Sequence, residues 1–176
     1  MIKRVIIVVI IAVFVLTMTF LSIGIASKTR RNNLLSDRIK ALPSFTFQKL
    51  DNEFFNSSDI KEGPVLIIRF HPECEHCKYE ISELMNSKIL LPGLMVLLVS
   101  SAAPDSIREF IRQFNFDQYP GVITMVDTSH RFGDIFGTDI VPSNFIYDKN
   151  LDLVKVLYGE VKTETILKYM LKYEDN

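Results

Sequence analysis

Two cysteines form the motif CEHC at residues 74–77, directly between an apolar run and an amphipathic segment. The run Val65–Phe70 is short and mostly apolar, which is typical of a central strand buried on both faces. After Pro72, apolar residues recur with the spacing of a helix. The pattern therefore predicts a strand-turn-helix unit with the cysteine pair at the turn.

Strands and helices alternate through the rest of the chain. Further strands are expected at Phe45–Phe47, Leu94–Val99, Val122–Val126, Ser143–Tyr147 and Leu151–Tyr158, and further helices from Pro104, at Arg131–Phe136 and from about Thr163. The turn-prone residues 148–150 favour an antiparallel hairpin between the last two strands. Helices interleaved with strands, followed by a hairpin and a closing helix, predict an α/β sandwich with a mixed sheet.

A different structure is expected at the N-terminus, where Val5–Ala26 contains 22 residues without a charge. A helix of this length crosses the hydrocarbon layer of a membrane. We expect a retained anchor over residues 1–26. A cleaved signal peptide is the alternative, because the small residues Gly24 and Ala26 suit signal peptidase, although the run is longer than a usual signal-peptide core.

Residues 27–44 carry five basic side chains and one acidic side chain, which predicts a juxtamembrane linker before a folded domain at 45–176. Residues 1–44 have a net charge of +6 and residues 45–176 a net charge of −7, which together give the −1 of the whole chain. The chain as a whole is therefore not basic, and we expect no nucleic-acid partner. Basic residues are slightly more numerous after the span than before it, which by itself favours a cytoplasmic domain.

The cysteine pair is expected to be redox-active, with its own disulfide as the only redox group and no metal or other cofactor. At the start of a helix, unpaired N–H groups and the helix dipole stabilise a thiolate. Cys74 at the helix tip is the expected nucleophile, and Cys77, one turn further on, is expected to resolve the mixed disulfide. Metal binding by the pair and a static disulfide are the alternatives. A static bridge closing so short a loop would stabilise the fold only weakly.

Charged neighbours of the pair affect its thiols in opposite directions. Protonated His76 favours a thiolate on Cys74, whereas Glu73 and Glu75 disfavour it. Glu80 lies three residues after Cys77 on the same helix face and is a candidate proton acceptor for the resolving thiol. We also expect His76 to contact the substrate. Solvated surface positions are the alternative for His76 and Glu80.

Val141-Pro142 is the second feature of note, because a proline begins a predicted strand far along the chain from the cysteines. Such a turn can hold a cis peptide bond, and an ordinary trans proline at the start of the strand is the alternative.

With these features in place, residues 45–171 resemble the thioredoxin-fold domains of the TlpA/redoxin type, within the AhpC/TSA-like superfamily. The matching stretches are PSFTFQKLDNEFFNSSDIKEGPVLIIRF, HPECEHCKYE and VPSNFIYDKN. The resemblance implies a thioredoxin-like sandwich in which Cys74 and Cys77 are the redox pair and Pro142 is cis beside them. It also implies that the backbone of Val141 aligns the substrate, and that Glu80 is the acidic residue found after the motif in several relatives. Most anchored relatives face outward, which implies a single-pass cell-membrane protein with an extracytoplasmic C-terminal domain.

Several positions depart from that family pattern. Glu73 stands where many relatives have tryptophan, no proline follows Cys74, and the strand Val65–Phe70 lacks the buried carboxylate of thioredoxin itself. The Pro-x-x-x-Thr-x-x-Cys arrangement of peroxiredoxins is also missing, since His71 occupies the threonine position. We therefore expect an enzyme that is not a peroxidase.

The sequence thus predicts a membrane-anchored thiol-disulfide oxidoreductase that acts on protein thiols and disulfides outside the cytoplasm, with a membrane electron donor or acceptor as a further partner. One alternative is a copper metallochaperone of the Sco type, in which the cysteines and His130, His71 or His76 bind the metal. Against it, Sco-like proteins space their cysteines by three residues. The other alternative is a redox-inactive, tethered interaction module.

Overall fold

The structure is a computed structural model that describes residues 14, 16–20, 37–87, 93–114, 119 and 121–171. Its contacts divide the chain into two units, Met1–Asp37 and Arg38–Asn176. In the first unit, residues 14 and 16–20 are helical and exposed. The rest of the predicted membrane span and most of the predicted linker lie outside the described residues. Within the described part of the chain, no helix combines the length and the apolar character needed to cross a membrane.

The second unit is built on one seven-stranded mixed sheet with the strand order β2-β1-β5-β4-β3-β6-β7. Its strands are β1 (Thr46–Lys49), β2 (Phe54–Asn56), β3 (Val65–Arg69), β4 (Met95–Ser100), β5 (Val122–Val126), β6 (Ser143–Tyr147) and β7 (Leu153–Tyr158). The helices are η1 (Ser57–Asp59, a 3-10 turn), α2 (Glu75–Asn86), α3 (Pro104–Phe114), α4 (Phe132–Phe136) and α5 (Thr163–Leu171). Strands β3, β4 and β5 run parallel, whereas β6 is antiparallel to β3 and β7 to β6.

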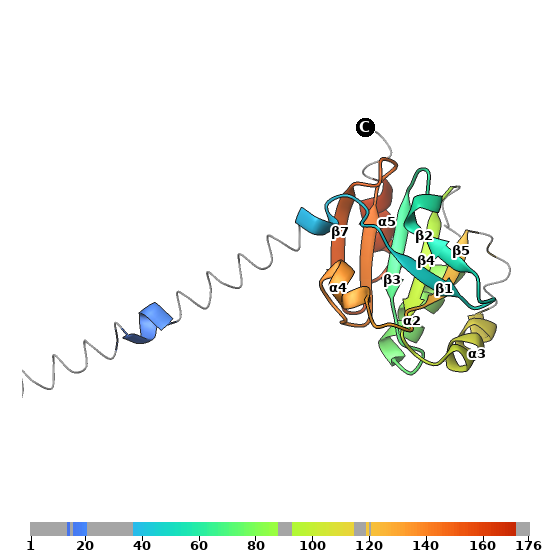
Figure 1. The fold of residues 1–176 in the computed structure, drawn as a ribbon, viewed down its shortest axis with the longest axis horizontal. Coiled ribbons are helices and arrows are strands. Elements are labelled where there is room, and N and C mark those ends of the chain that lie inside the picture. The colour runs from blue at the N-terminus through green and yellow to red at the C-terminus, as the bar shows by residue number, and fades with distance from the viewer. Residues whose placement is uncertain are drawn as a thin grey trace, which may run out of the picture. The chain divides into compact units, whose positions relative to one another are not determined.

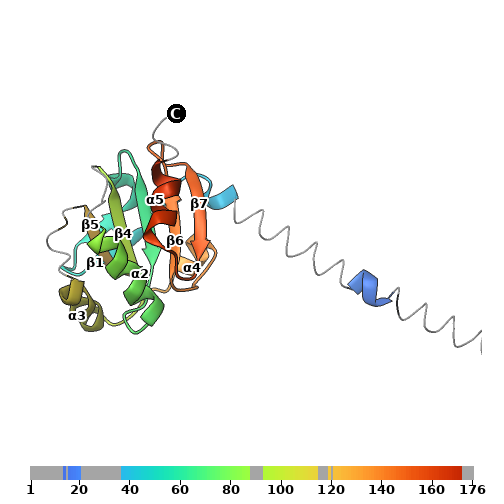
Figure 2. The ribbon, with the colours of Figure 1, turned by 180° about the vertical axis from the view of Figure 1, so that it is seen from behind.

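Strand β3 lies near the middle of the sheet, between β4 and β6, and every one of its residues is buried. Its apolar side chains alternate between two cores. Leu66 and Ile68 face the core beneath α2, α3 and α5, and Val65 and Ile67 face the core beneath α4. Figures 1 and 2 show α2 and α5 on one face of the sheet and α4 on the other. Burial on both faces explains why this strand reads as a continuous apolar run.

The folded unit begins before Phe45, the start expected from the sequence. Ile39 is buried, and its carbonyl accepts a hydrogen bond of 3.2 Å from the Tyr147 hydroxyl. Leu42 N–H donates to the Leu151 carbonyl at 2.8 Å, so this segment pairs with the β6–β7 hairpin. Residues 38–44 carry too few apolar side chains for a periodic pattern, and backbone hydrogen bonds attach them to the domain.

The predicted α/β sandwich with a mixed sheet is confirmed, and each strand and helix expected from periodicity is present within the second unit. Strand β2 and the turn η1 have no counterpart in the periodicity analysis, although the resemblance included that stretch. They are three residues each, too short to show a period. Asn56 and Asp59 bracket η1 in a capping box, which ends β2 and turns the chain toward β3.

Replacing Tyr147 by phenylalanine tests whether residues 38–44 are an integral part of the domain. Tyr147→Phe removes the hydrogen bond to Ile39 and leaves a buried carbonyl without that donor, so we expect a loss of about 1 kcal/mol in the free energy of unfolding. Tyr158→Phe is the matched control, because Tyr158 is exposed. Denaturant unfolding of both variants measures the difference. Equal stabilities of Tyr147→Phe and the wild type would show that the hydrogen bond between Tyr147 and Ile39 contributes nothing to folding.

Candidate active site

The cysteine pair lies where β3 leads into α2. Cys74 occupies the N-cap position of α2, and its Sγ accepts a hydrogen bond from the Cys77 N–H at 3.4 Å. The Cys74 N–H donates to the His71 carbonyl at 3.0 Å, which closes the turn before the helix. The positive end of the α2 dipole therefore points at the Cys74 sulfur.

The two thiols differ in exposure. Both are free thiols, with Cys74 partly exposed and Cys77 completely buried. Burial, and secondarily a hydrogen bond with Cys74, raise the pKa of the Cys77 thiol above its ordinary value. A partner can therefore reach Cys74 first, whereas Cys77 needs a base before it can react. The order of reaction, with Cys74 as nucleophile and Cys77 as resolving thiol, stays a prediction.

Glu80 lies on the same helix as the cysteines and is only 1% exposed. Its Oε1 accepts from Asn144 Nδ2 at 3.0 Å, and its Oε2 accepts from the Val161 N–H at 2.6 Å. Burial raises the pKa of Glu80 to about 7, against the two hydrogen bonds that favour the charged form, and nearby Glu160 raises it further. A carboxyl group with this pKa exchanges protons near neutral pH. The alternative of a solvated surface glutamate is therefore wrong.

The Val141–Pro142 peptide bond is cis, as the resemblance implies. The Gly159 N–H donates to the Pro142 carbonyl at 2.9 Å, and Ser143 Oγ donates to the Ile140 carbonyl at 2.7 Å. Pro142 is buried and Val141 is half-buried, at the start of β6. The role of these two residues in aligning a substrate stays a prediction.

His76 lies at the surface between the two cysteines in the chain, with 74% of its side chain exposed. Its Nδ1 is 2.6 Å from Glu160 Oε2, and Glu160 precedes the Val161 N–H that binds Glu80. The imidazole thus links the first turn of α2 to the β7–α5 connection. Its contact with substrate remains a prediction.

Two members of this arrangement were missed from the sequence. Strand β6 has the sequence SNFIY and is buried throughout, so the amide of Asn144 ahead of its apolar residues was an available signal. Glu160 carries no such signal, because it lies in a connection whose approach to α2 depends on tertiary packing.

A copper site would need a histidine close to both cysteines. The described residues contain no group of three or more His, Cys, Asp and Glu side chains that could hold a metal ion. His71 Nδ1 lies 3.3 Å from the Glu73 N–H, and His76 contacts Glu160. His130 lies in the β5–α4 connection. The residues that the copper alternative names are therefore not assembled into a ligand set.

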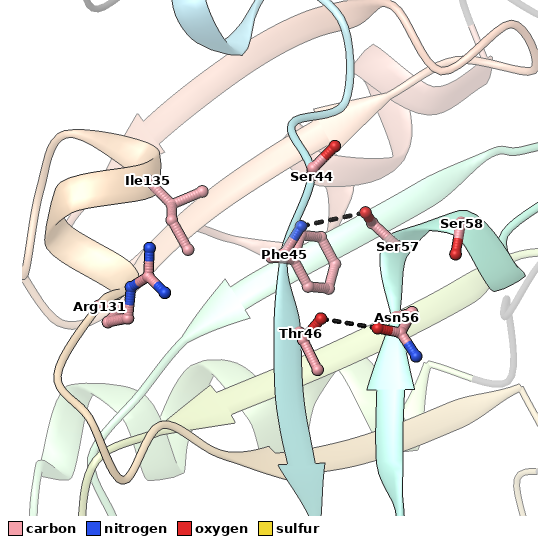
Figure 3. A pocket seen from close by; sticks show the side chains of 8 residues that line it. All are labelled: Ser44, Phe45, Thr46, Asn56, Ser57, Ser58, Arg131 and Ile135. Atoms are coloured by element: carbon pink, nitrogen blue, oxygen red, sulfur yellow. Dashed lines mark hydrogen bonds between the residues drawn. The ribbon is translucent and has the colours of Figure 1, made fainter.

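Two pockets mark different sides of the domain. One, of about 290 Å³, lies over the start of β1, between η1 and α4 (Figure 3). Its lining residues are Ser44, Phe45, Thr46, Asn56, Ser57, Ser58, Arg131 and Ile135. None of them belongs to the cysteine site, and α4 is on the sheet face opposite α2. The other pocket, of about 410 Å³, lies beside the CEHC turn and is lined by Pro72, Glu73 and Lys78 together with residues of α3.

A sheet of this topology with a CxxC pair at the N-terminus of α2 and a cis-proline at the start of β6 defines a thioredoxin-fold domain. The model of the AhpC/TSA family matches residues 39–156, and the chain belongs to that family. A search of curated proteins finds no match.

Solved structures share the fold at low sequence identity. A secreted thiol-disulfide isomerase from Corynebacterium glutamicum is 20% identical, with a TM-score of 0.66 and coverage of 77% of this chain and 86% of that one. A secreted disulfide oxidoreductase from Mycobacterium tuberculosis, homologous to E. coli DsbE, is 14% identical, with a TM-score of 0.61 and coverage of 76% and 96%. The peroxidoxin BcpB from M. tuberculosis is 13% identical, with a TM-score of 0.62 and coverage of 77% and 94%.

The raised pKa of Glu80 predicts a specific dependence of stability on pH. Between the ordinary value of 4.5 and about 7, the folded protein binds more protons at this site than the unfolded chain does. The free energy of unfolding therefore falls as pH rises through this window, by up to about 3 kcal/mol, and this contribution is constant above it. Glu80→Gln lacks the effect, so the stability of the wild type relative to this variant should fall from pH 4.5 to 8.

Urea unfolding of the reduced proteins at several pH values measures this difference, in which the contributions of other groups cancel. Glu83→Gln, an exposed position on the same helix, is the control and should show no such trend. A difference between wild type and Glu80→Gln that is independent of pH would contradict the assignment.

Proposed function

We propose that this protein is a thiol-disulfide oxidoreductase that is anchored in the membrane and acts on protein thiols and disulfides outside the cytoplasm. The observation that carries the proposal is the asymmetric dithiol: an accessible Cys74 at the tip of α2 and a buried Cys77 one turn behind it. Glu80 on the same helix supplies a buried group that can take up a proton.

In the reducing direction, the Cys74 thiolate attacks a substrate disulfide, forms a mixed disulfide and releases one substrate thiolate. The Cys77 thiol passes its proton to the Glu80 carboxylate, and the resulting thiolate attacks Cys74 Sγ. This step breaks the mixed disulfide, releases the second substrate thiolate and leaves a Cys74–Cys77 disulfide. Two electrons move from the dithiol to the substrate, and the same steps reversed oxidise a substrate dithiol.

Substrate contacts are proposed around Cys74, at the backbone of Val141, at Pro142 and at His76. The half-buried Val141 lies directly before the cis-proline, and His76 is exposed on the first turn of α2. No cofactor besides the disulfide is proposed. Because each turnover changes the redox state of the Cys74–Cys77 pair, a membrane electron donor or acceptor is proposed to restore it.

A peroxidase function is not proposed, although a peroxidoxin shares the fold. His71 stands at the position of the peroxiredoxin threonine, and its ring nitrogen lies 3.3 Å from the Glu73 N–H. The position therefore lacks the hydroxyl group of that threonine near the reactive cysteine. Hydrogen peroxide should consequently be consumed no faster by the wild type than by Cys74→Ser.

Thiol exchange with a glutathionylated peptide tests the proposed chemistry. The wild type should release glutathione and form a Cys74–Cys77 disulfide that dithiothreitol reverses. Cys77→Ser should accumulate a mixed disulfide on Cys74 because it has no resolving thiol, and Cys74→Ser should be inactive. Mass spectrometry of the alkylated proteins identifies each species. A wild type in which the two thiols never form a reversible disulfide would rule the function out.

The anchor is tested on the full chain in cells. The uncharged run Val5–Ala26 is long enough to span the membrane, so the full chain should stay in the membrane pellet after carbonate extraction, whereas a variant lacking residues 1–26 should not. Protease added outside the cytoplasmic membrane should digest the C-terminal domain. Release of the full chain by carbonate would contradict the anchor, and protection of the domain would contradict its extracytoplasmic side.

A further inference from the structure

Arg69 is a charged residue in the middle of the sheet, at the last position of β3. It is 4% exposed, and its neighbours across the sheet are Val99 on β4 and Ser143 on β6. Its side chain lies on the α4 face, where its guanidinium carbon is 5.1 Å from the centre of the Phe132 ring. Every other residue of β3 is apolar, so this position stands out within the strand.

The guanidinium connects the turns that surround the carboxyl ends of three parallel strands. Its Nη2 donates to Ser101 Oγ, just after β4, at 2.8 Å and lies 3.5 Å from Asp139 Oδ1, just before β6. Its Nη1 is 3.9 Å from Asp127 Oδ2, just after β5. One side chain therefore contacts all three of these turns from the strand that leads to Cys74.

This arrangement is unfavourable if folding is its only purpose. Arg69 Nε and Nη1 have no hydrogen-bond partner, and burial lowers the pKa of the guanidinium. Asp127 does not need Arg69 as a hydrogen-bond donor, since it already accepts from the Arg131 and Phe132 N–H groups at 2.9 Å each. An apolar side chain would avoid the cost of burying an incompletely paired charge.

The contact with Asp139 links Arg69 to the segment that leads to the cis-proline. Asp139 lies three residues before Pro142, in the segment that carries Val141, and its side chain is 63% exposed. A Cβ atom at Gly133 on α4 would clash with the Asp139 carboxylate, so glycine there leaves space for this side chain. The Arg69–Asp139 pair thus joins the strand before the CEHC turn to the segment before the cis-proline.

We propose that Arg69 is a positioning residue which, through Asp139, holds the segment 139–142 in place beside Cys74 for contact with substrate. This role rests on the proposed function, because it concerns the alignment of a disulfide-bearing partner. The positioning role can be distinguished by measurement from a direct effect on the Cys74 thiol. Loss of the pair should slow reactions that need the Val141–Pro142 segment and should not alter the intrinsic reactivity of Cys74.

Asp139→Ala is the informative variant, because an exposed side chain can be removed without opening the core. Two rates are compared: mixed-disulfide formation with the glutathionylated peptide, and alkylation of Cys74 by iodoacetamide, which needs no contact with residues 139–142. We expect the first to fall by up to about fivefold, the upper limit for an exposed ion pair, and the second to be unchanged. Asp134→Ala, an exposed carboxylate on α4, is the control and should match the wild type.

Replacing Arg69 itself adds a second test. Arg69→Met should slow the peptide reaction more than Asp139→Ala does. Arg69→Lys, which keeps the charge and reaches fewer partners, should fall between Arg69→Met and the wild type. A peptide rate of Asp139→Ala equal to that of the wild type, or an equal fall in both of its rates, would overturn the positioning role. A wild type that is alkylated at Cys74 and yet forms no mixed disulfide would instead overturn the proposed function, and this role with it.

Discussion

The burial of β3 between β4 and β6 is the constraint on which the site depends. A strand covered on both faces has no freedom to shift its register, because a slip of one residue would exchange its two sets of side chains between the cores. The residues that follow it are therefore fixed in space. The Phe70 N–H donates to the Val99 carbonyl at 3.0 Å, and the CEHC motif begins four residues later, at Cys74. The N-terminus of α2, and with it the Cys74 sulfur, takes its position from this strand.

Reactivity at the second cysteine depends on the same burial. Packing α2 against the sheet places Cys77 and Glu80 in an apolar core. Desolvation makes both the thiolate and the carboxylate less favourable, so the pKa of each group rises. In the proposed mechanism, the proton moves from the Cys77 thiol to the Glu80 carboxylate, three residues away on the same helix, and the single negative charge moves from the carboxylate to the sulfur. The Asn144 and Val161 hydrogen bonds keep the Glu80 carboxyl in one orientation for this exchange.

The sequence was sufficient for the parts of the fold that rest on local periodicity. The apolar run of β3 and the spacing along α2 located the cysteines at a strand-helix junction, and residues 143–158 gave a hairpin. The parts that could not be predicted rest on contacts between distant segments. Ile39 joins the domain through the hydroxyl of Tyr147, and His76 meets Glu160 across 84 positions of sequence. Neither contact leaves a pattern in the chain, because each depends on how whole elements pack.

Two buried charged groups, Glu80 and Arg69, lie at the beginning of β6, one on each face of the sheet. Glu80 binds Asn144 from the α2 face, whereas Arg69, which is in register with Ser143, approaches from the α4 face and reaches Asp139. Successive residues of a strand point to opposite faces, so Asn144 lies on the face of Glu80 and Ser143 on the face of Arg69. Apolar side chains of similar volume at either position would avoid the free-energy cost of burying a charge. Their burial at this one place supports the proposed function, in which the cis-proline segment keeps its position while a disulfide forms and breaks.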